Sequence, residues 1–329
     1  MRQKIFYIDT YKTLDMINND KSKSIKNYDI IDYEIKKNDL KEIISQMSYS
    51  GGFESTNLTK AINITRNMID DNQCTRFLSF VGAIISTGAR GIVKDMIKRK
   101  MFDCIITTCG ALDHDVAKTF GKYYAGEFNI NDSYLKKRNI HRLGNVFIPT
   151  KNYGPLIENK VQHFLLEYYD KHKEVSGHEI VDYIGSKLDD NSILYWAHKN
   201  KIPVIVPGLV DGAVGSQIWL FYQQHKDFVL NLLKDQSRIS DLVFDAKKTG
   251  ALMLGGGISK HHTLWWNQFR DGLDYAVYVT TANEWDGSLS GAEVREAISW
   301  NKVNVNAKQV TIHGEITTLL PFIYASLYR

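Results

Sequence analysis

Short apolar runs alternate along the chain with longer segments in which apolar residues recur every three or four positions. The runs predict six buried strands: Phe77–Val81, Asp103–Thr107, Pro203–Val206, Ala251–Leu254, Ala276–Thr280 and Val310–His313. The segments around them predict helices over residues 57–72, 88–100, 112–122, 155–172, 177–188, 215–234, 239–248, 260–270, 291–300 and 315–327. Strands that are apolar at successive positions are typical of a parallel sheet covered on both faces. We therefore predict an α/β fold in which helices lie on both faces of a parallel sheet.

The first fifty residues do not follow this pattern. They are rich in Lys, Asn and Asp and hold few apolar clusters, and Gly51-Gly52 interrupts the chain directly after them. We interpret residues 1–50 as an N-terminal extension and residues 51–329 as one domain. The chain is 43% hydrophobic, which is enough to build a sizeable core.

Composition excludes several classes of protein. The net charge is only +4, and basic patches such as residues 97–100 are interleaved with acids, so we expect no nucleic-acid partner. The cysteines Cys74, Cys104 and Cys109 show neither a disulfide framework nor zinc spacing, which predicts no metal site and a reducing compartment. No apolar run approaches the roughly 18 residues that span a bilayer, and the N-terminus lacks a signal sequence. We expect a cytoplasmic protein that does not enter a membrane.

Candidate chemistry lies after the predicted strands, because ligands of open α/β sheets bind at the carboxyl ends of the strands. Gly255-Gly256-Gly257 follows a strand and precedes a helix, which suits a pyrophosphate held against bare backbone. Ser86-Thr87-Gly88 occupies a similar place, although these residues are equally typical of a helix cap. Asp211 stands among glycines and suits a ribose hydroxyl or a turn. Asp113 and His114 open another helix, either as site residues or as complements of its dipole.

The stretch after the fifth strand is the most unusual. Trp285 is followed by a predicted helix that carries Glu296 and Trp300 on one face, with Lys302 at its end. Acids, indole faces and a lysine can together hold an amine, but an amphipathic helix ending in a lysine has the same pattern. His261 is a candidate general base, or a surface residue. The adjacent His262 points elsewhere on a helix, so the pair is not expected to share a metal.

Taken in order, these segments resemble deoxyhypusine synthase from about Gly52 to the C-terminus. The similar segments are GGFESTNLTKAI, FVGAIISTGAR, TTCGALDHD, YYAGEF, HRLGNVFIP, YWAHKNKIPVIVPGLVDGAVGS, LGGGISKHH, YAVYVTTANEWDGSLSGA and EAISWNKV. Many motifs in one order are far more specific than any single motif. The resemblance favours chemical roles for Lys302 and His261.

The resemblance implies a Rossmann-like domain that assembles as a homotetramer with active sites across dimer interfaces. It also implies that NAD oxidises spermidine, that 1,3-diaminopropane leaves, and that Lys302 carries the butylamine group as an imine. The group then passes to one lysine of the translation initiation factor 5A precursor. A lysine must be neutral to attack an imine, and burial beside Trp300 would favour the neutral form.

Strand ends and resemblance together give the expected site residues. Lys302 and His261 are expected to be catalytic. Residues expected to bind the amine are Glu296, Trp300, Trp285, Ser216 and Leu289. Residues expected to bind NAD are Ser86, Thr108, Cys109, Gly110, His114, Asp211, Gly255, Gly256, Gly257, Thr281, Ala282, Asp286, Gly287, Ser290 and Glu315.

The sequence departs from animal-type members at the amine site. Ser216 and Leu289 stand where those members carry acids that grip the polyamine, and Asn301 replaces the glycine before the lysine. Asp113, Glu284, Asp286 and Glu296 remain as possible counter-charges. Two alternatives stay open: a homospermidine synthase, which passes the same group to putrescine, and a catalytically silent NAD-binding homologue.

Overall fold

The computed structural model describes residues 29–35 and 39–328, and most of the predicted N-terminal extension lies outside them. The described end of that extension forms α2 (Leu40–Met47), whose N-cap is Asp39. Ile44 of α2 is buried in the main core, so this helix packs with the domain that follows it. Within the described residues, no helix combines the length and the apolar character needed to cross a membrane.

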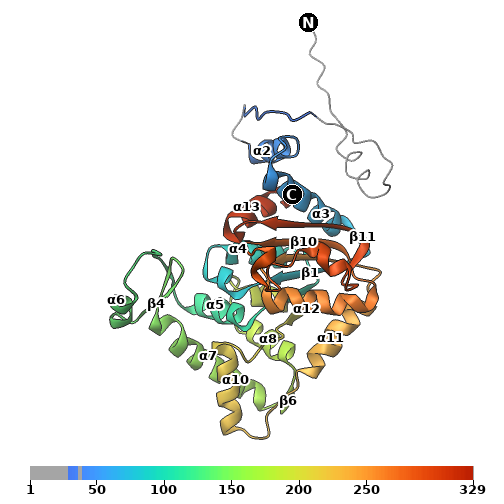
Figure 1. The fold of residues 1–329 in the computed structure, drawn as a ribbon. Helices are drawn as coiled ribbons and strands as arrows, with labels where there is room; N and C mark the ends of the chain where they lie inside the picture. The colour runs from blue at the N-terminus through green and yellow to red at the C-terminus, as the bar shows by residue number, and fades with distance from the viewer. Residues whose placement is uncertain (1–28, 36–38, 329) are drawn as a thin grey trace.

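Six parallel strands form the central sheet, which confirms the predicted α/β fold (Figure 1). In order across the sheet they are β11 (Val303–His313), β10 (Leu273–Thr280), β9 (Lys248–Leu254), β1 (Cys74–Phe80), β2 (Cys104–Ile106) and β7 (Val204–Ile205). From β1 the chain builds outward through β2 to β7, then crosses to β9 on the other side of β1. The β1–β9 boundary is therefore where the order of the strands reverses.

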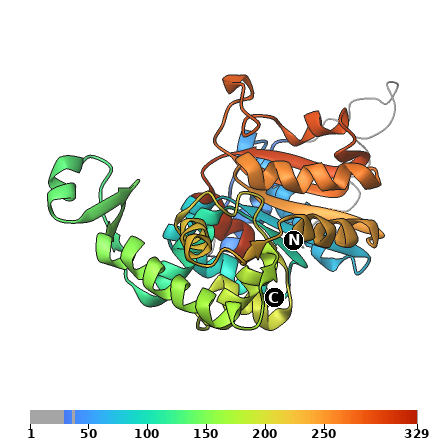
Figure 2. The same ribbon diagram turned by 90° about the horizontal axis from the view of Figure 1, so that it is seen from below.

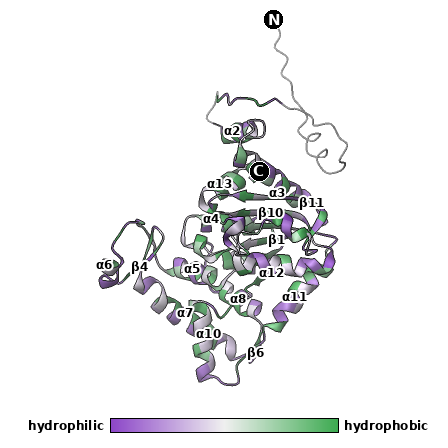
Figure 3. Cartoon of the chain, viewed as in Figure 1, coloured by the Kyte–Doolittle hydropathy of each residue, from purple (hydrophilic) through white to green (hydrophobic). Residues whose placement is uncertain are grey.

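Alternate residues of the strands face two separate cores, which is why most strand residues in the middle of the sheet are apolar. Figure 3 shows hydrophobic colour along these strands. Leu78 and Phe80 face the larger core, together with α3 (Phe53–Asp70), α4 (Ala89–Lys98) and α13 (Ile316–Leu327). Phe77 faces the smaller core, which α11 (Leu233–Phe244) and α12 (Gly257–Asn267) cover. These helices form the two outer layers predicted from the sequence.

The remaining elements extend the larger core and carry a projecting lobe. The helices are α5 (Cys109–Phe120), α7 (Gly154–Tyr169), α8 (Gly177–Ser186), α9 (Ile193–Asn200) and α10 (Ala213–Gln224). A three-stranded antiparallel sheet with one helix projects away from the body (Figure 2). It consists of β3 (Tyr124–Ala125), β4 (Ile140–Leu143), β5 (Val146–Pro149) and α6 (Asp132–Lys137). A short parallel pair, β6 (Glu174–Val175) and β8 (Val229–Leu230), completes the fold.

Two predicted helices are wrong. The helix over 215–234 is interrupted: α10 ends at Gln224, and α11 begins only at Leu233. The break brings Phe228 into the core, where its ring packs edge-on against Phe221. The helix over 291–300 is a short 3₁₀ helix, Val294–Ile298, so Glu296 and Trp300 do not share an α-helical face.

Candidate functional site

The loops that carry most of the predicted cofactor residues meet at the carboxyl edge of the sheet, around the β1–β9 boundary (Figure 1). A Cβ on Gly255, at the end of β9, would lie 2.8 Å from Val81 at the end of β1. A Cβ on Gly208, after β7, would lie 3.7 Å from Ile258 at the start of α12. Strand ends that are distant in the sequence therefore form one surface, at the place where open α/β sheets bind ligands.

The glycine loop after β9 leads directly into α12. Gly255 and Gly257 have φ of +83° and +73°, a left-handed conformation that side chains disfavour. No side chain of the described residues caps the start of α12, so the first backbone N–H groups are available to an anion. A Cβ on Gly257 would meet no described atom within 4 Å. A Cβ on Gly256, in contrast, would lie 2.6 Å from the Cα of Ser290, so the loop after β10 also packs here.

The start of α5 forms the next part of this surface. Its N-cap, Thr108, makes no capping hydrogen bond through its side chain. Gly110 has ordinary contacts of 3.9 Å around the position of a Cβ. The Cys109 side chain is buried and points toward Gly212, where a Cβ would lie 2.6 Å from Sγ. Burial raises the pKa of the Cys109 thiol, which favours the protonated form.

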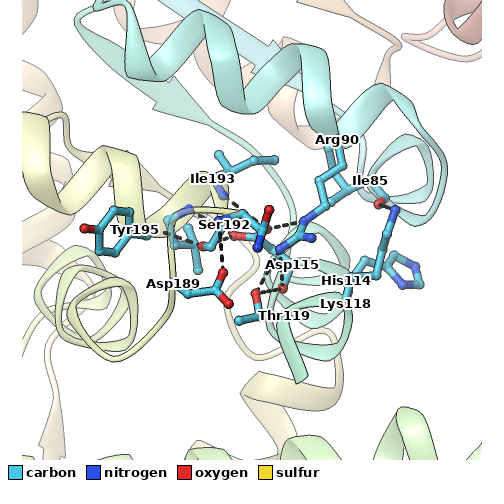
Figure 4. Close-up of polar contacts among 12 residues, drawn as sticks. Ile85, Arg90, His114, Asp115, Lys118, Thr119, Asp189, Ser192, Ile193 and Tyr195 are labelled. Atoms are coloured by element: carbon cyan, nitrogen blue, oxygen red, sulfur yellow. Dashed lines mark hydrogen bonds and ion pairs between the residues drawn. The ribbon is translucent and has the colours of Figure 1, made fainter. Parts of the chain in front are cut away.

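Lys118 of α5 fixes the loop after β1. Its Nζ donates to the carbonyl oxygens of Ile85, Ser86 and Thr87 at 3.1, 3.1 and 2.6 Å. Figure 4 shows this lysine beside Ile85, near the start of α4. Burial lowers the pKa of Lys118 to about 8. The Ser86 hydroxyl donates to the carbonyl of Ala83 at 2.7 Å, so it already closes the 3₁₀ turn before α4.

A buried ion pair anchors α5 to its neighbours (Figure 4). The Asp115 carboxylate lies 2.7 Å from Arg90 Nε of α4 and accepts a hydrogen bond from the Ser192 hydroxyl at 2.7 Å. It also accepts from the backbone N–H groups of Ile193 and Leu194, at the start of α9. Three helices thus meet on one carboxylate, which holds the start of α5 in place.

Asp113 and His114 have structural partners. Asp113 accepts hydrogen bonds from the N–H groups of Ala213 and Val214 at 2.9 and 2.7 Å and so caps α10. Burial raises its pKa, and these hydrogen bonds oppose the shift. His114 is buried, with Nδ1 3.0 Å from the Tyr123 hydroxyl, and burial lowers its pKa to about 4. His114 is therefore a neutral ring at pH 7.

Asp211 lies in the loop that follows β7, and Ser216 lies just after that loop. Asp211 is exposed, as a residue that binds a ribose hydroxyl requires. Ser216 is exposed on the first turns of α10, where its hydroxyl donates to the carbonyl of Gly212 at 2.9 Å. Ser216 thus offers a polar surface but no charge.

The loop after β10, residues 281–293, folds back over the start of α12. The buried Lys260 holds it by donating to the carbonyls of Leu289 and Ala292 at 2.9 and 2.5 Å. Burial lowers the pKa of Lys260 to about 8. The Tyr278 hydroxyl donates to the carbonyl of Ser290 at 2.6 Å. Other predicted residues of this loop are at least partly accessible: Thr281, Ala282, Trp285, Asp286, Gly287 and Leu289.

Glu315 is the N-cap of α13. Its carboxylate accepts hydrogen bonds from the N–H groups of Thr317 and Thr318, both at 2.9 Å, and from both hydroxyls. These bonds lower its pKa, although burial acts in the opposite direction and is the largest single effect. A cofactor contact at Glu315 would therefore share a carboxylate that already caps a helix.

Lys302 lies where the sequence did not predict. It directly precedes β11, at the amino-terminal edge of the sheet, because Val303 pairs with Leu273 at the start of β10. Its side chain lies beside α12, with Nζ 5.4 Å from the ring centre of Trp265 and 5.3 Å from that of Trp300. Lys302 is half-buried and Trp300 is 64% exposed, so one copy of the chain does not provide the deep burial expected from the sequence.

His261 lies on the same face of α12, one turn before Trp265, with 5.7 Å between the ring centres. Its pKa is lowered first by burial and then by the positive charge of Lys302, so the two side chains are neighbours. His261 Nδ1 is buried and has no hydrogen-bond partner among the described residues. The structure thus brings His261, Lys302 and Trp300 together.

Comparison with known proteins identifies the family. The family model described as deoxyhypusine synthase matches residues 42–327. The chain belongs to the deoxyhypusine synthase family. A Thermoplasma volcanium protein described as "Probable deoxyhypusine synthase" is 56% identical over 288 residues, which are 87% of this chain and 92% of the relative. A Picrophilus torridus protein with the same description is 53% identical over 291 residues, 88% of this chain and 93% of the relative.

A solved structure supports the fold of this deoxyhypusine synthase family member. A candidate deoxyhypusine synthase from Entamoeba histolytica matches with a TM-score of 0.63 and 22% identity, over 90% of this chain and 96% of that one. Membership of the family indicates a transferase of the deoxyhypusine synthase type.

Three residues that shape this site were not identified from the sequence: Trp265, Lys118 and Lys260. Each lies inside an amphipathic helix, where a tryptophan or lysine is ordinarily a surface residue. The role of the two lysines can be recognised only in the folded structure, where each binds backbone carbonyl groups of a neighbouring loop. Trp265 has one local signal, its spacing of four residues from His261.

Proposed function

We propose that the chain transfers the 4-aminobutyl group of spermidine to a lysine of the translation initiation factor 5A precursor, in the cytoplasm, with NAD as cofactor. The observation that carries the proposal is the position of Lys302 Nζ between two indole rings and beside His261, in a member of the deoxyhypusine synthase family. A lysine in this setting can hold an aliphatic amine as an imine.

The loops at the carboxyl edge fit NAD. The uncapped start of α12 and the open space at Gly257 can accept a pyrophosphate, and the exposed Asp211 can bind a ribose hydroxyl. Thr108 and Gly110 provide a second uncapped helix start on the same surface. When bound, NAD supplies the two-electron oxidation of the amine and the later reduction of the product imine.

His261 and Lys302 supply the protein's part of the reaction. The lowered pKa of His261 keeps its ring neutral at pH 7, so it can accept a proton from the amine nitrogen during oxidation. Lys302 Nζ then adds to the imine carbon, the bond from that carbon to the original nitrogen breaks, and 1,3-diaminopropane leaves. The acceptor lysine adds to the same carbon and releases Nζ.

A second copy of the chain fits this scheme. Trp300, beside Lys302, is 64% exposed in one copy, and Trp285 of the loop after β10 is 86% exposed. An imine on Lys302 must be protected from water. The proposal therefore includes a homotetramer in which a neighbouring copy covers Trp300 and Trp285.

Borohydride trapping tests the proposal. The protein is incubated with NAD and spermidine labelled in the butyl chain, then reduced, digested and analysed by mass spectrometry. We expect the label on Lys302, its loss in Lys302→Ala with NAD still bound, and its retention in Lys308→Ala, an exposed lysine of β11. Label that persists in Lys302→Ala would contradict the assignment.

The second half of the experiment identifies the acceptor. The labelled enzyme is divided between the initiation factor precursor and putrescine. Transfer to the protein supports the proposed function, whereas transfer to putrescine alone identifies a homospermidine synthase. A wild-type protein that binds NAD but never acquires label would be a silent homologue.

A further inference from the structure

The acids that the sequence offers as counter-charges for an amine, and Glu293 close to them in the chain, are mostly engaged within the protein. Glu284 lies 2.9 Å from Arg295, and Glu293 lies 2.6 Å from the same guanidinium. Asp286 accepts a hydrogen bond from the N–H of Ser288 at 2.7 Å. Asp113 is buried under α10, far along the chain from this loop. Glu284 and Glu293 are thus paired with a cation, Asp113 caps α10, and Asp286 binds a neighbouring backbone N–H.

Glu296 is the remaining carboxylate, and its surroundings limit what it can do. Glu296 is exposed, and its carboxylate makes no hydrogen bond or ion pair with the described residues. It does act electrostatically on the buried Lys260, where its charge favours the protonated amine. One acid that also balances a buried lysine is a weak basis for holding a substrate with several positive charges.

Aromatic rings are more abundant than acidic side chains around Lys302. Trp265 and Trp300 flank Lys302 Nζ at 5.4 and 5.3 Å, within the range of a cation–π interaction. Both indoles are accessible, Trp265 at 43%. Phe269, in the 3₁₀ turn that follows α12, packs edge-on against Trp265 with 6.2 Å between the ring centres and supports that ring. The two indole faces beside Lys302 Nζ are therefore available to the cationic chain of a substrate that reaches this lysine.

We propose that Trp265 is a specificity-determining residue, which with Trp300 forms an aromatic clamp for the cationic chain of the amine substrate. The proposal rests on the proposed function and specifies its substrate class. An indole face attracts a cation without needing its N–H groups, whereas a carboxylate gains most from a primary ammonium that donates hydrogen bonds. The site therefore accepts a polyamine with an N-methylated aminobutyl end as well as an unmodified one.

Kinetics with two donors test the clamp. Spermidine and spermidine methylated on the nitrogen of its aminobutyl end are compared in wild type, Trp265→Phe, Trp265→Leu and Trp265→Asp. We expect Trp265→Leu to raise KM for both donors about five- to thirty-fold, the range of a cation–π contact. Trp265→Phe should stay within about threefold, because it keeps an aromatic face. Trp265→Asp should shift the preference at least tenfold toward unmodified spermidine.

A matched control and a binding measurement separate the possible failures. Trp266→Phe alters the neighbouring tryptophan, whose indole N–H donates to Gln236 at 3.1 Å, and should leave both KM values unchanged. Calorimetry of each amine with the NAD-saturated proteins should show the same order as KM, and thermal melts check that each variant folds. An active wild type whose Trp265→Leu and Trp265→Asp variants keep its KM values and donor preference would overturn the clamp alone. A folded wild type that neither binds nor oxidises either amine would overturn the proposed function and the clamp with it.

Discussion

Replacing Asp115 by Asn should destabilise the protein more than the same Asp→Asn substitution at its surface. Asp115 and its partner Arg90 are buried, with side-chain exposures of 2% and 10%. The substitution keeps the shape of the side chain and removes its charge. Arg90 would then keep a positive charge in the interior without a counter-ion.

The magnitude follows from the hydrogen bonds that the carboxylate accepts. One oxygen accepts from Arg90 Nε and the N–H of Ile193, the other from the Ser192 hydroxyl and the N–H of Leu194. The amide of an asparagine must turn its NH₂ group toward one of these donor pairs. Breaking a buried ion pair by removing one partner costs about 3–5 kcal/mol. An N–H group left facing another donor adds about 1–3 kcal/mol.

Urea unfolding followed by circular dichroism measures this loss, with Asp132→Asn as the control. Asp132 binds Arg142 through two hydrogen bonds of 2.7 and 2.8 Å, but its side chain is 63% exposed. An exposed pair of this kind contributes about 1 kcal/mol or less. If Asp115→Asn lost no more unfolding free energy than Asp132→Asn, the argument from burial would be refuted.

Two further predictions concern the backbone before Lys302 and the response to acid. Asn301 has φ of +56°, so Asn301→Gly should change the free energy of unfolding by less than about 1 kcal/mol, whereas Asn301→Val should cost about 1–2 kcal/mol in denaturant titration. Burial lowers the pKa of His262 to about 4, below its ordinary 6.5, so its contribution to stability is complete above pH 6.5 and is lost as pH falls toward 4. His262→Leu should remove about 2–4 kcal/mol of that acid-dependent loss, and His141→Leu, at an exposed histidine, should not.

The sheet could be predicted from the sequence because burial on both faces leaves a continuous apolar run. All six predicted strands exist, although β11 begins seven residues earlier than its prediction, at Val303. Its first half alternates apolar and polar residues, as in Val303-Asn304-Val305-Asn306, and therefore lacks a continuous apolar run. The projecting lobe was missed for a related reason, since its strands have two to four residues and little burial.

The glycine loops could be located because each follows a buried strand, whereas the position of Lys302 could not be predicted. The pattern around Glu296 and Trp300 resembles an amphipathic helix, but the chain makes one 3₁₀ turn and enters β11. Asn301 provides the change of direction through its left-handed backbone. This conformation also explains why Asn can replace the glycine found before the lysine in animal-type members, since Asn is among the few other residues that adopt it readily.

Helix α12 resolves the apparent separation between the cofactor surface and the lysine. Its uncapped start lies at the carboxyl edge of the sheet, His261 follows after one turn, and Trp265 after another. At a rise of about 1.5 Å per residue, the eight residues from Gly257 to Trp265 cover roughly 12 Å. Lys302 begins at the opposite edge and reaches back along this face to the two indoles. In the proposed function, this helix would set the spacing between the dinucleotide, His261 and Lys302, so a change in its register would alter that spacing.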